Sequence, residues 1–206
     1  MKYTKLLFCL TLLIISSSVN AQDASKIMDA ITSSIKKHKS IKSSYTIIYN
    51  ESGKTNSHNG AIILQGNKYV NKINGTMTWF NGKTMWAYVE DNEEVTVTNP
   101  TADEIASSNP YSFLNSSKQE FNASLLSSNS SQYTIKLTPK TKKEDINNII
   151  LNVKKVSYQP IDMTIDMKKS KMTIRLNSFE TNQAYKTSSF TFNKNKYPNV
   201  EIVDLR

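Results

Sequence analysis

The chain has 206 residues, a formal net charge of +9 at pH 7 and one cysteine, Cys9. This length is sufficient for one well-buried core. Because the single cysteine lies so close to the N-terminus, the remainder of the chain can form no disulfide bond, thiolate metal site or cysteine nucleophile. The positive charge comes mostly from scattered lysines without interleaved base-stacking aromatic residues. It therefore argues against nucleic acid as a partner and indicates only a weak attraction to anionic surfaces.

The first 21 residues, MKYTKLLFCLTLLIISSSVNA, have the pattern of a secretory signal peptide. Two early lysines precede a short apolar run at residues 6–15, and residues 19–21 fit a small-residue cleavage site. The apolar run is short for a membrane span, although an uncleaved anchor stays open as an alternative. Cys9 lies too early for a lipid-attachment cysteine. We expect residues 1–21 to be removed on export and residues 22–206 to form one domain.

The apolar residues change from a helical period to a strand period near residue 43. Within residues 23–39, Ile27, Ile31 and Ile35 repeat every four residues, which predicts an amphipathic helix. Later segments alternate between apolar and polar residues and are separated by turn signals. We count about 10–11 such strands, and one apolar face with one wet face is typical of an antiparallel sheet. The short strand spacing predicts a barrel or a strongly curved sheet, mainly β with few helices (α+β).

The strand pattern is interrupted at residues 101–115, TADEIASSNPYSFLN. Thr101 and Glu104 have capping-box spacing, which predicts the start of a helix. Asn109 and Pro110 form a second cap followed by proline at a first helical position. We predict two short helices inserted between strands.

No motif for catalysis, a metal or a cofactor is found in the sequence. His38 lies among lysines at the end of the predicted helix and His58 lies in a predicted polar turn, so both are expected at the surface. Glu93 and Glu94 would point to opposite faces of a strand and form no general acid/base pair. We therefore expect no enzyme activity, cofactor or metal. The aromatic and methionine side chains fit either an ordinary core or an adaptable apolar pocket.

The segment FNGKTMWAYVEDNEEVTVTNP, residues 80–100, resembles a signature of the LolA-like periplasmic outer-membrane lipoprotein carriers. That family has the pattern D-G-K-x-[LM]-W-x-Y, a polar turn, and E-[VA]-T-V, matched here at residues 81–88 and 94–97. Further segments are similar to the family in the same order along the chain: SIKSSYTIIY, GAIILQGNKYV, NPYSFL, YTIKLTP, NIILNV and SSFTFNKNKYPNVEIVDL. The abundance of asparagine and lysine is typical of a Bacteroidota-type member.

The resemblance implies a single-domain incomplete antiparallel β-barrel with an N-terminal helix and short lid helices. It implies a monomeric periplasmic carrier that shelters lipoprotein acyl chains and moves them from the inner to the outer membrane. The implied partners are an inner-membrane ABC-type lipoprotein release complex and, in some systems, an outer-membrane receptor. A periplasmic lipid- or glycolipid-binding protein, or an envelope-stress sensor of the same fold, stays open as the alternative.

The resemblance also places the candidate site on the strands and the two inserted helices. The candidates for the lipid cavity are Ile62, Leu64, Tyr69, Trp79, Trp86, Tyr88, Val95, Val97, Ile135, Ile149, Met163, Ile165, Met172 and Ile174. The candidates for the lid are Ile105, Tyr111, Phe113 and Leu114. Whether Trp86 and Tyr88 or their neighbours of opposite parity face inward stays open.

One position departs from the family pattern. The family has an arginine before a Pro-Asn pair early in the sheet, where it bonds to the lid, and Gly66 stands at that position here. Lys68 is the nearest possible substitute, although lysine lacks the planar fork of donors that arginine has.

Overall fold

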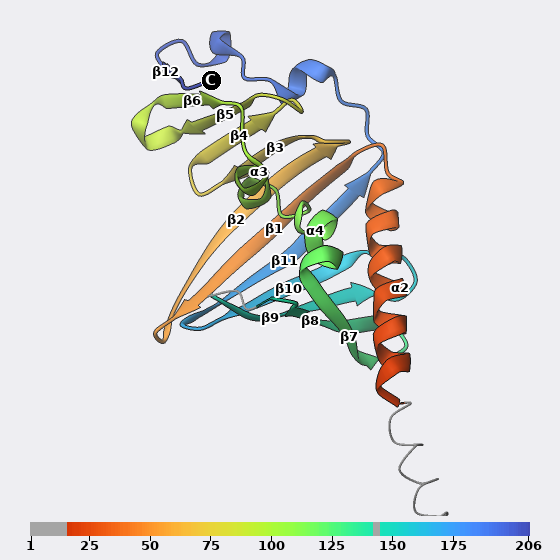
Figure 1. The fold of residues 1–206 in the computed structure, drawn as a ribbon. Coiled ribbons are helices and arrows are strands. Elements are labelled where there is room, and N and C mark those ends of the chain that lie inside the picture. The colour runs from red at the N-terminus through yellow and green to blue at the C-terminus, as the bar shows by residue number, and fades with distance from the viewer. Residues whose placement is uncertain (1–15, 142–144) are drawn as a thin grey trace, which may run out of the picture.

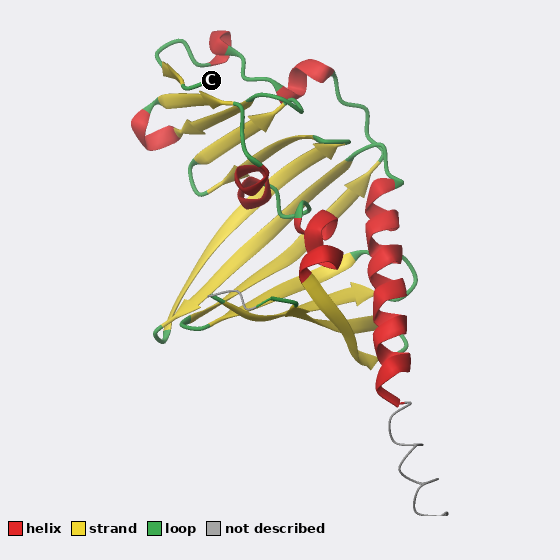
Figure 2. Ribbon diagram, viewed as in Figure 1, coloured by secondary structure: helices red, strands yellow, loops and turns green. Residues whose placement is uncertain are grey.

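A single twisted sheet with helices against one face makes up most of the structure (Figure 1 and Figure 2). The computed structural model describes residues 16–141 and 145–206. Most of the predicted signal peptide lies outside the described residues, and residues 16–21 form the start of the first helix. Cleavage after residue 21 therefore stays a prediction.

The first helix, α2 (Ser16–Lys36), runs beside the curved sheet and packs against strand β7 and helix α4 (Figure 1). It begins seven residues before and ends three residues before the predicted boundaries. Ile27, Ile31 and Ile35 are all buried, so the predicted apolar face of this helix is confirmed.

The sheet has twelve strands in the order β12-β6-β5-β4-β3-β2-β1-β11-β10-β9-β8-β7. Neighbouring strands are antiparallel, except that β12 runs parallel to β6. Strand β1 pairs with β2 on one side and with β11 on the other, so it joins the two halves of the chain. The strands are β1 (Ile41–Glu51), β2 (Lys54–Gln65), β3 (Lys68–Ile73), β4 (Thr76–Phe80), β5 (Met85–Val89), β6 (Glu94–Thr98), β7 (Phe121–Ser128), β8 (Gln132–Pro139), β9 (Ile146–Lys154), β10 (Pro160–Met167), β11 (Ser170–Thr181) and β12 (Glu201–Asp204).

The predicted incomplete barrel is confirmed, because strands β12 and β7 form two edges of an open, curved sheet. The strand count is slightly higher than predicted. The segment SSFTF, residues 188–192, has the alternation typical of a strand, but it overlaps the 3₁₀ helix η2 (Thr187–Phe190). Phe190 is fully buried against Val70 and Trp79, so this segment crosses a face of the sheet instead of extending an edge.

Two short helices, α3 (Ala102–Ser108) and α4 (Phe113–Glu120), lie over the inner face of the sheet (Figure 1). The predicted capping box is confirmed, since Thr101 Oγ1 accepts from the Glu104 amide at 3.3 Å and Glu104 Oε2 accepts from the Thr101 amide at 2.6 Å. Between the helices, Asn109 Oδ1 accepts from the Tyr111 amide at 2.9 Å. Helix α4 begins at Phe113, three residues after Pro110, the predicted first helical position, and its N-cap residue is Ser112, not Asn109.

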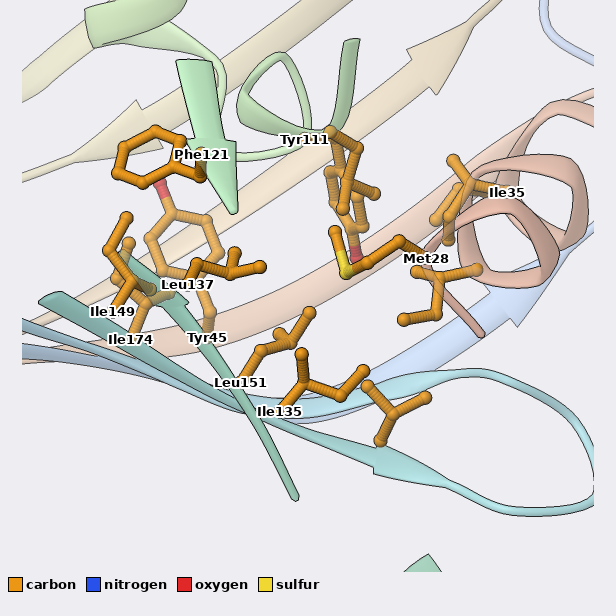
Figure 3. Close-up of a cluster of buried hydrophobic side chains, with 14 of the residues drawn as sticks. Met28, Ile35, Tyr45, Tyr111, Phe121, Ile135, Leu137, Ile149, Leu151 and Ile174 are labelled. Atoms are coloured by element: carbon orange, nitrogen blue, oxygen red, sulfur yellow. The ribbon is translucent and has the colours of Figure 1, made fainter. Parts of the chain in front are cut away.

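The inner face of the sheet carries the main core. Figure 3 shows side chains of α2, including Met28 and Ile35, opposite Ile135 and Leu151 from the strands. Tyr111, from the segment between α3 and α4, is buried in the same cluster. The helices thus cover the inner face and leave hollows at their margins.

Candidate functional site

Three neighbouring hollows lie beneath the segment that carries α3 and α4 (residues 102–120, the α3–α4 segment). Their volumes are about 510, 40 and 460 Å³. The two large volumes are within the range of roughly 300–1,000 Å³ that is typical of small-molecule sites. They have different chemical linings.

The first hollow, here called the apolar hollow, lies between the α3–α4 segment and strands β1, β3 and β9–β11. Five of the predicted cavity residues line it: Ile149, Met163, Ile165, Met172 and Ile174. Phe113, a predicted lid residue, lines it from helix α4. Sequence reasoning missed Tyr45, Ile47, Ile73 and Ile146, which complete much of its apolar wall. Met163, Ile165 and Met172 are only partly buried, so the wall is open to a ligand.

The second hollow, here called the polar-rimmed pocket, lies near the end of α2 and the β2–β3 turn. Its apolar floor consists of Ile35, Ile41, Leu64, Phe80, Ile105, Tyr111 and Leu114. Its other lining residues are Thr32, Lys36, His38, Gly66, Asn67, Gly82, Asn109, Ser112 and Asn115. The predicted lid residues Ile105, Tyr111 and Leu114 and the predicted cavity residue Leu64 therefore meet at this pocket.

A narrow crevice of about 40 Å³ shares lining residues with both large hollows. It shares Tyr111 and Leu114 with the polar-rimmed pocket and Tyr45, Phe113 and Met163 with the apolar hollow. The three hollows form one interrupted path under the α3–α4 segment.

The remaining predicted cavity residues fall into two groups. Ile62, Tyr69 and Ile135 lie on the inner face and are almost fully buried in the core beneath the hollows. A second set lies on the outer face, in two smaller clusters with residues 185–200 (the C-terminal segment): Trp79, Trp86, Tyr88, Val95 and Val97.

The expectation that these five outer-face residues line the cavity is corrected by their packing. Phe80 and Met85 belong to the inner core, so strand alternation directs Trp79 and Trp86 to the opposite face. There, Trp79 makes edge contacts with Phe192 and Tyr197, at ring-centroid distances of 5.5 and 5.8 Å. The C-terminal segment covers the aromatic face of the hairpin.

Hydrogen bonds hold the α3–α4 segment on the sheet. Ser108, at the end of α3, bonds to the hydroxyl of Tyr69, and its carbonyl accepts from Asn71 Nδ2 at 3.0 Å. Asn71 Oδ1 in turn accepts from the Tyr45 hydroxyl at 2.7 Å. A second link joins the Tyr111 hydroxyl, the donor, to Ser43 Oγ at 3.1 Å. These links join residues distant in sequence, and no local motif signals them.

Burial affects the ionisation of the tyrosines in these links. It raises the pKa of Tyr111 to about 12, although the bond to Ser43 acts in the opposite direction. Burial also raises the pKa of Tyr45 and of Tyr69. All three hydroxyls are therefore neutral near pH 7 and can serve as hydrogen-bond donors.

Lys68, the possible substitute for the family's arginine, makes no such contact with the α3–α4 segment. Its side chain has no hydrogen bond or ion pair within the described part of the chain and lines none of the three hollows. Gly66 adopts a φ of +61° in the β2–β3 turn, a conformation that disfavours arginine and most other residues. Tyr69 and Asn71 on β3 provide the polar contacts to the α3–α4 segment instead.

Each of the two histidines contacts an aromatic ring. His38 contacts Phe179 edge-on at 6.1 Å, and His58 lies within β2, not in a turn, beside Tyr49. Within residues 16–141 and 145–206, no three His, Cys, Asp or Glu side chains are grouped so that they could hold a metal ion. No helix in the same ranges has the length and apolar character needed to cross a membrane.

The curved open sheet and the covering helices define an open half-barrel with a largely apolar hollow under its helices. A family model for outer membrane lipoprotein carrier protein LolA matches residues 15–171, so the chain belongs to this family. No curated protein sequence matches the chain.

Solved structures share the fold at low sequence identity. A conserved protein from Thermus thermophilus is 9% identical with a TM-score of 0.60, over 88% of this chain and 99% of that one. A DUF1329 family protein from Desulfovibrio piger is 12% identical, with a TM-score of 0.47 over 82% and 97% of the two chains. A LolA superfamily protein from Nitrosomonas europaea is 11% identical, with a TM-score of 0.43 over the same shares. Of these, only the first is similar enough to support the fold assignment.

Proposed function

We propose that this protein is a periplasmic carrier that shelters the acyl chains of lipoproteins and moves them from the inner to the outer membrane. The observation that carries this proposal is the apolar hollow, whose wall of partly buried Ile and Met side chains is covered by a short helical segment. Methionine side chains adapt to different apolar ligands. The family's description as outer membrane lipoprotein carriers supports the same use.

The energetics favour such a site for acyl chains. Each methylene withdrawn from water contributes about 0.8 kcal/mol, so a long chain gains on the order of 10 kcal/mol when fully sheltered. A hollow of about 510 Å³ accepts part of this hydrocarbon as it stands. Displacement of the α3–α4 segment would join it to the polar-rimmed pocket and enlarge the sheltered volume.

The first test replaces the methionines of the hollow. The double variant Met163→Gln and Met172→Gln keeps side-chain length but adds buried amides, which a bound acyl chain cannot satisfy. We expect at least tenfold weaker binding of a triacylated lipopeptide, measured by displacement of an apolar fluorescent probe. Arg175→Gln, on the exposed face of the same strand β11, is the control and should bind as the wild type does. Equal affinity in the folded double variant would remove the apolar hollow from the proposal.

Native mass spectrometry of the protein from its own periplasm identifies the natural ligand. A bound triacylated lipoprotein would support the carrier role. A copurified phospholipid or glycolipid would instead favour a lipid-binding protein or a sensor of the same fold. An empty protein that also ignores added lipopeptide would contradict both roles.

The carrier role requires a donor and an acceptor. We propose an inner-membrane ABC-type release complex as the donor and the outer membrane, with or without a receptor, as the acceptor. Reconstituted release complex should transfer lipoprotein from vesicles to this protein only when ATP is present. Transfer that proceeds equally without the complex would contradict this assignment.

A further inference from the structure

The two ends of the path under the α3–α4 segment carry opposite charges. The lining of the polar-rimmed pocket includes Lys36 and His38 and no carboxylate. The lining of the apolar hollow includes Asp103 and Glu120 and no cationic side chain. An amphiphile with an anionic end therefore has a preferred direction in this path.

The polar-rimmed pocket also offers donors that the described fold does not use. Lys36 Nζ and the side-chain amides of Asn67 and Asn115 have no hydrogen bond or ion pair within the described ranges. Asn109 uses only its Oδ1, which accepts from the Tyr111 amide, so its Nδ2 donor is unused. In contrast to Lys36, Lys118 on nearby α4 is already paired, because its ammonium lies 2.7 Å from the carboxylate of Asp29.

The floor beneath these donors is apolar. Leu64, Phe80 and Ile105 lie below the rim, and Tyr111 and Leu114 continue into the crevice. A free inorganic anion would gain nothing from such a floor. A molecule with an oxygen-rich anionic end and an attached hydrocarbon chain would use both parts of the pocket.

We infer that the polar-rimmed pocket binds the anionic head of an amphiphile, a carboxylate or a phosphate, with Lys36 and the rim amides as donors. The hydrocarbon chain extends from the head along the floor toward the crevice. This inference rests on the acyl-chain binding of the proposed function, not on the identity of the cargo as a lipoprotein, and it adds a preference for acylated molecules with an anionic group next to the chain. Lysine acts here as a mobile point charge, which suits heads of different shape.

The test compares ligands that share one chain and differ only at the head. Hexadecanol, hexadecanoate and hexadecyl phosphate displace the same apolar probe from protein purified from the periplasm and stripped of lipid. We expect the two anionic ligands to bind more tightly than the alcohol, and Lys36→Gln to reduce that preference roughly three- to tenfold. Lys37→Gln is the matched control. It removes the same charge from a neighbouring exposed lysine that lines none of the three hollows. A second variant, Asn67→Leu, should weaken the anionic ligands without affecting the alcohol.

Each other outcome is decisive. Equal binding of all three ligands, with no effect of Lys36→Gln, would overturn the head-group site and leave the carrier proposal intact. Failure of all three to bind would contradict the acyl-chain function itself. Inorganic phosphate that displaces the anionic ligands completely at millimolar concentration would identify a free-anion site and overturn the amphiphile assignment. A preference for hexadecyl phosphate over hexadecanoate, or the reverse, shows whether the pocket selects a phosphate or a carboxylate head.

Discussion

Tyr45 on β1 lies directly against Gly60, its partner on β2, and no larger residue fits there without movement. A Cβ atom added to Gly60 would lie 2.4 Å from Cζ of the tyrosine ring. The ring crosses β2 at this point, and its hydroxyl reaches Asn71 on β3. The glycine thus permits the hydrogen bonds that connect the sheet to the α3–α4 segment.

Gly60→Ala is expected to destabilise the fold by about 1–3 kcal/mol, because the ring must move and its bond to Asn71 is strained. Denaturant unfolding measures this change. In a Tyr45→Leu background the collision is removed, and alanine should then be neutral or stabilising by up to about 1 kcal/mol, since glycine in a strand interior is unfavourable. An equal cost of alanine in both backgrounds would contradict the contact.

Asn71 connects two buried partners, so its replacement tests how the α3–α4 segment is held. Asn71→Leu leaves the Tyr45 hydroxyl and the Ser108 carbonyl without their partners, at about 1–3 kcal/mol for each group. We expect amides of α3 to exchange with solvent at least tenfold faster, as measured by hydrogen exchange.

Asn59→Leu provides the comparison for Asn71. Asn59 also bonds across strands, to Thr46 at 2.9 Å, but it is exposed and has no contact of this kind with the α3–α4 segment. Its replacement should leave exchange in α3 unchanged. Equal acceleration by both variants would indicate a general loss of stability and remove Asn71 from this role.

Gly66→Arg tests whether an arginine at the family's position can hold the α3–α4 segment in this chain. Holding a residue other than glycine at a φ of +61° costs about 1–2 kcal/mol of folding free energy. We therefore expect the arginine variant to be less stable than the wild type and hydrogen exchange in α3 not to slow. Gly66→Asn should cost less, because asparagine tolerates this conformation better. Thermal unfolding ranks the stability of the two variants. A Gly66→Arg protein that is more stable than the wild type and exchanges more slowly in α3 would contradict the expectation.

The sequence predicts the features that local patterns determine. Periods of four and two identify α2 and most of the strands, and the Thr101 capping box identifies α3. The inward parity of β5 has no such signal, because Trp86 and Met85 are both apolar and both faces are covered. The cover on the outer face depends on the C-terminal segment, whose SSFTF pattern is also typical of a strand.

The hydrogen bonds between the sheet and the α3–α4 segment cannot be predicted from local sequence patterns either. Tyr45 and Asn71 are 26 residues apart, and Asn71 and Ser108 are 37 apart. Asparagine on a strand is typically a surface residue, yet Asn71 is buried because two partners satisfy its amide. Such a pairing follows from the strand register and the path of the α3–α4 segment, which no single stretch of sequence specifies.

Alkaline pH is expected to loosen the α3–α4 segment. The pKa of Tyr111 rises from an ordinary value of 10.0 to about 12, so the folded state retains a proton that the unfolded chain loses first. The stabilisation is complete below pH 10 and is lost as the pH rises from 10 to 12, by roughly 3 kcal/mol. Tyr45 and Tyr69 add to the same trend, since burial raises their pKa as well.

Denaturant unfolding at pH 8 to 12 measures this loss. Tyr111→Phe should lower stability at pH 8, because Ser43 loses its bond to the hydroxyl, and should flatten the decline above pH 10. Tyr49→Phe, at the more exposed end of β1, should keep the wild-type slope. A Tyr111→Phe protein with the full alkaline decline would show that another group titrates, and the buried hydroxyl would then have no part in the pH response.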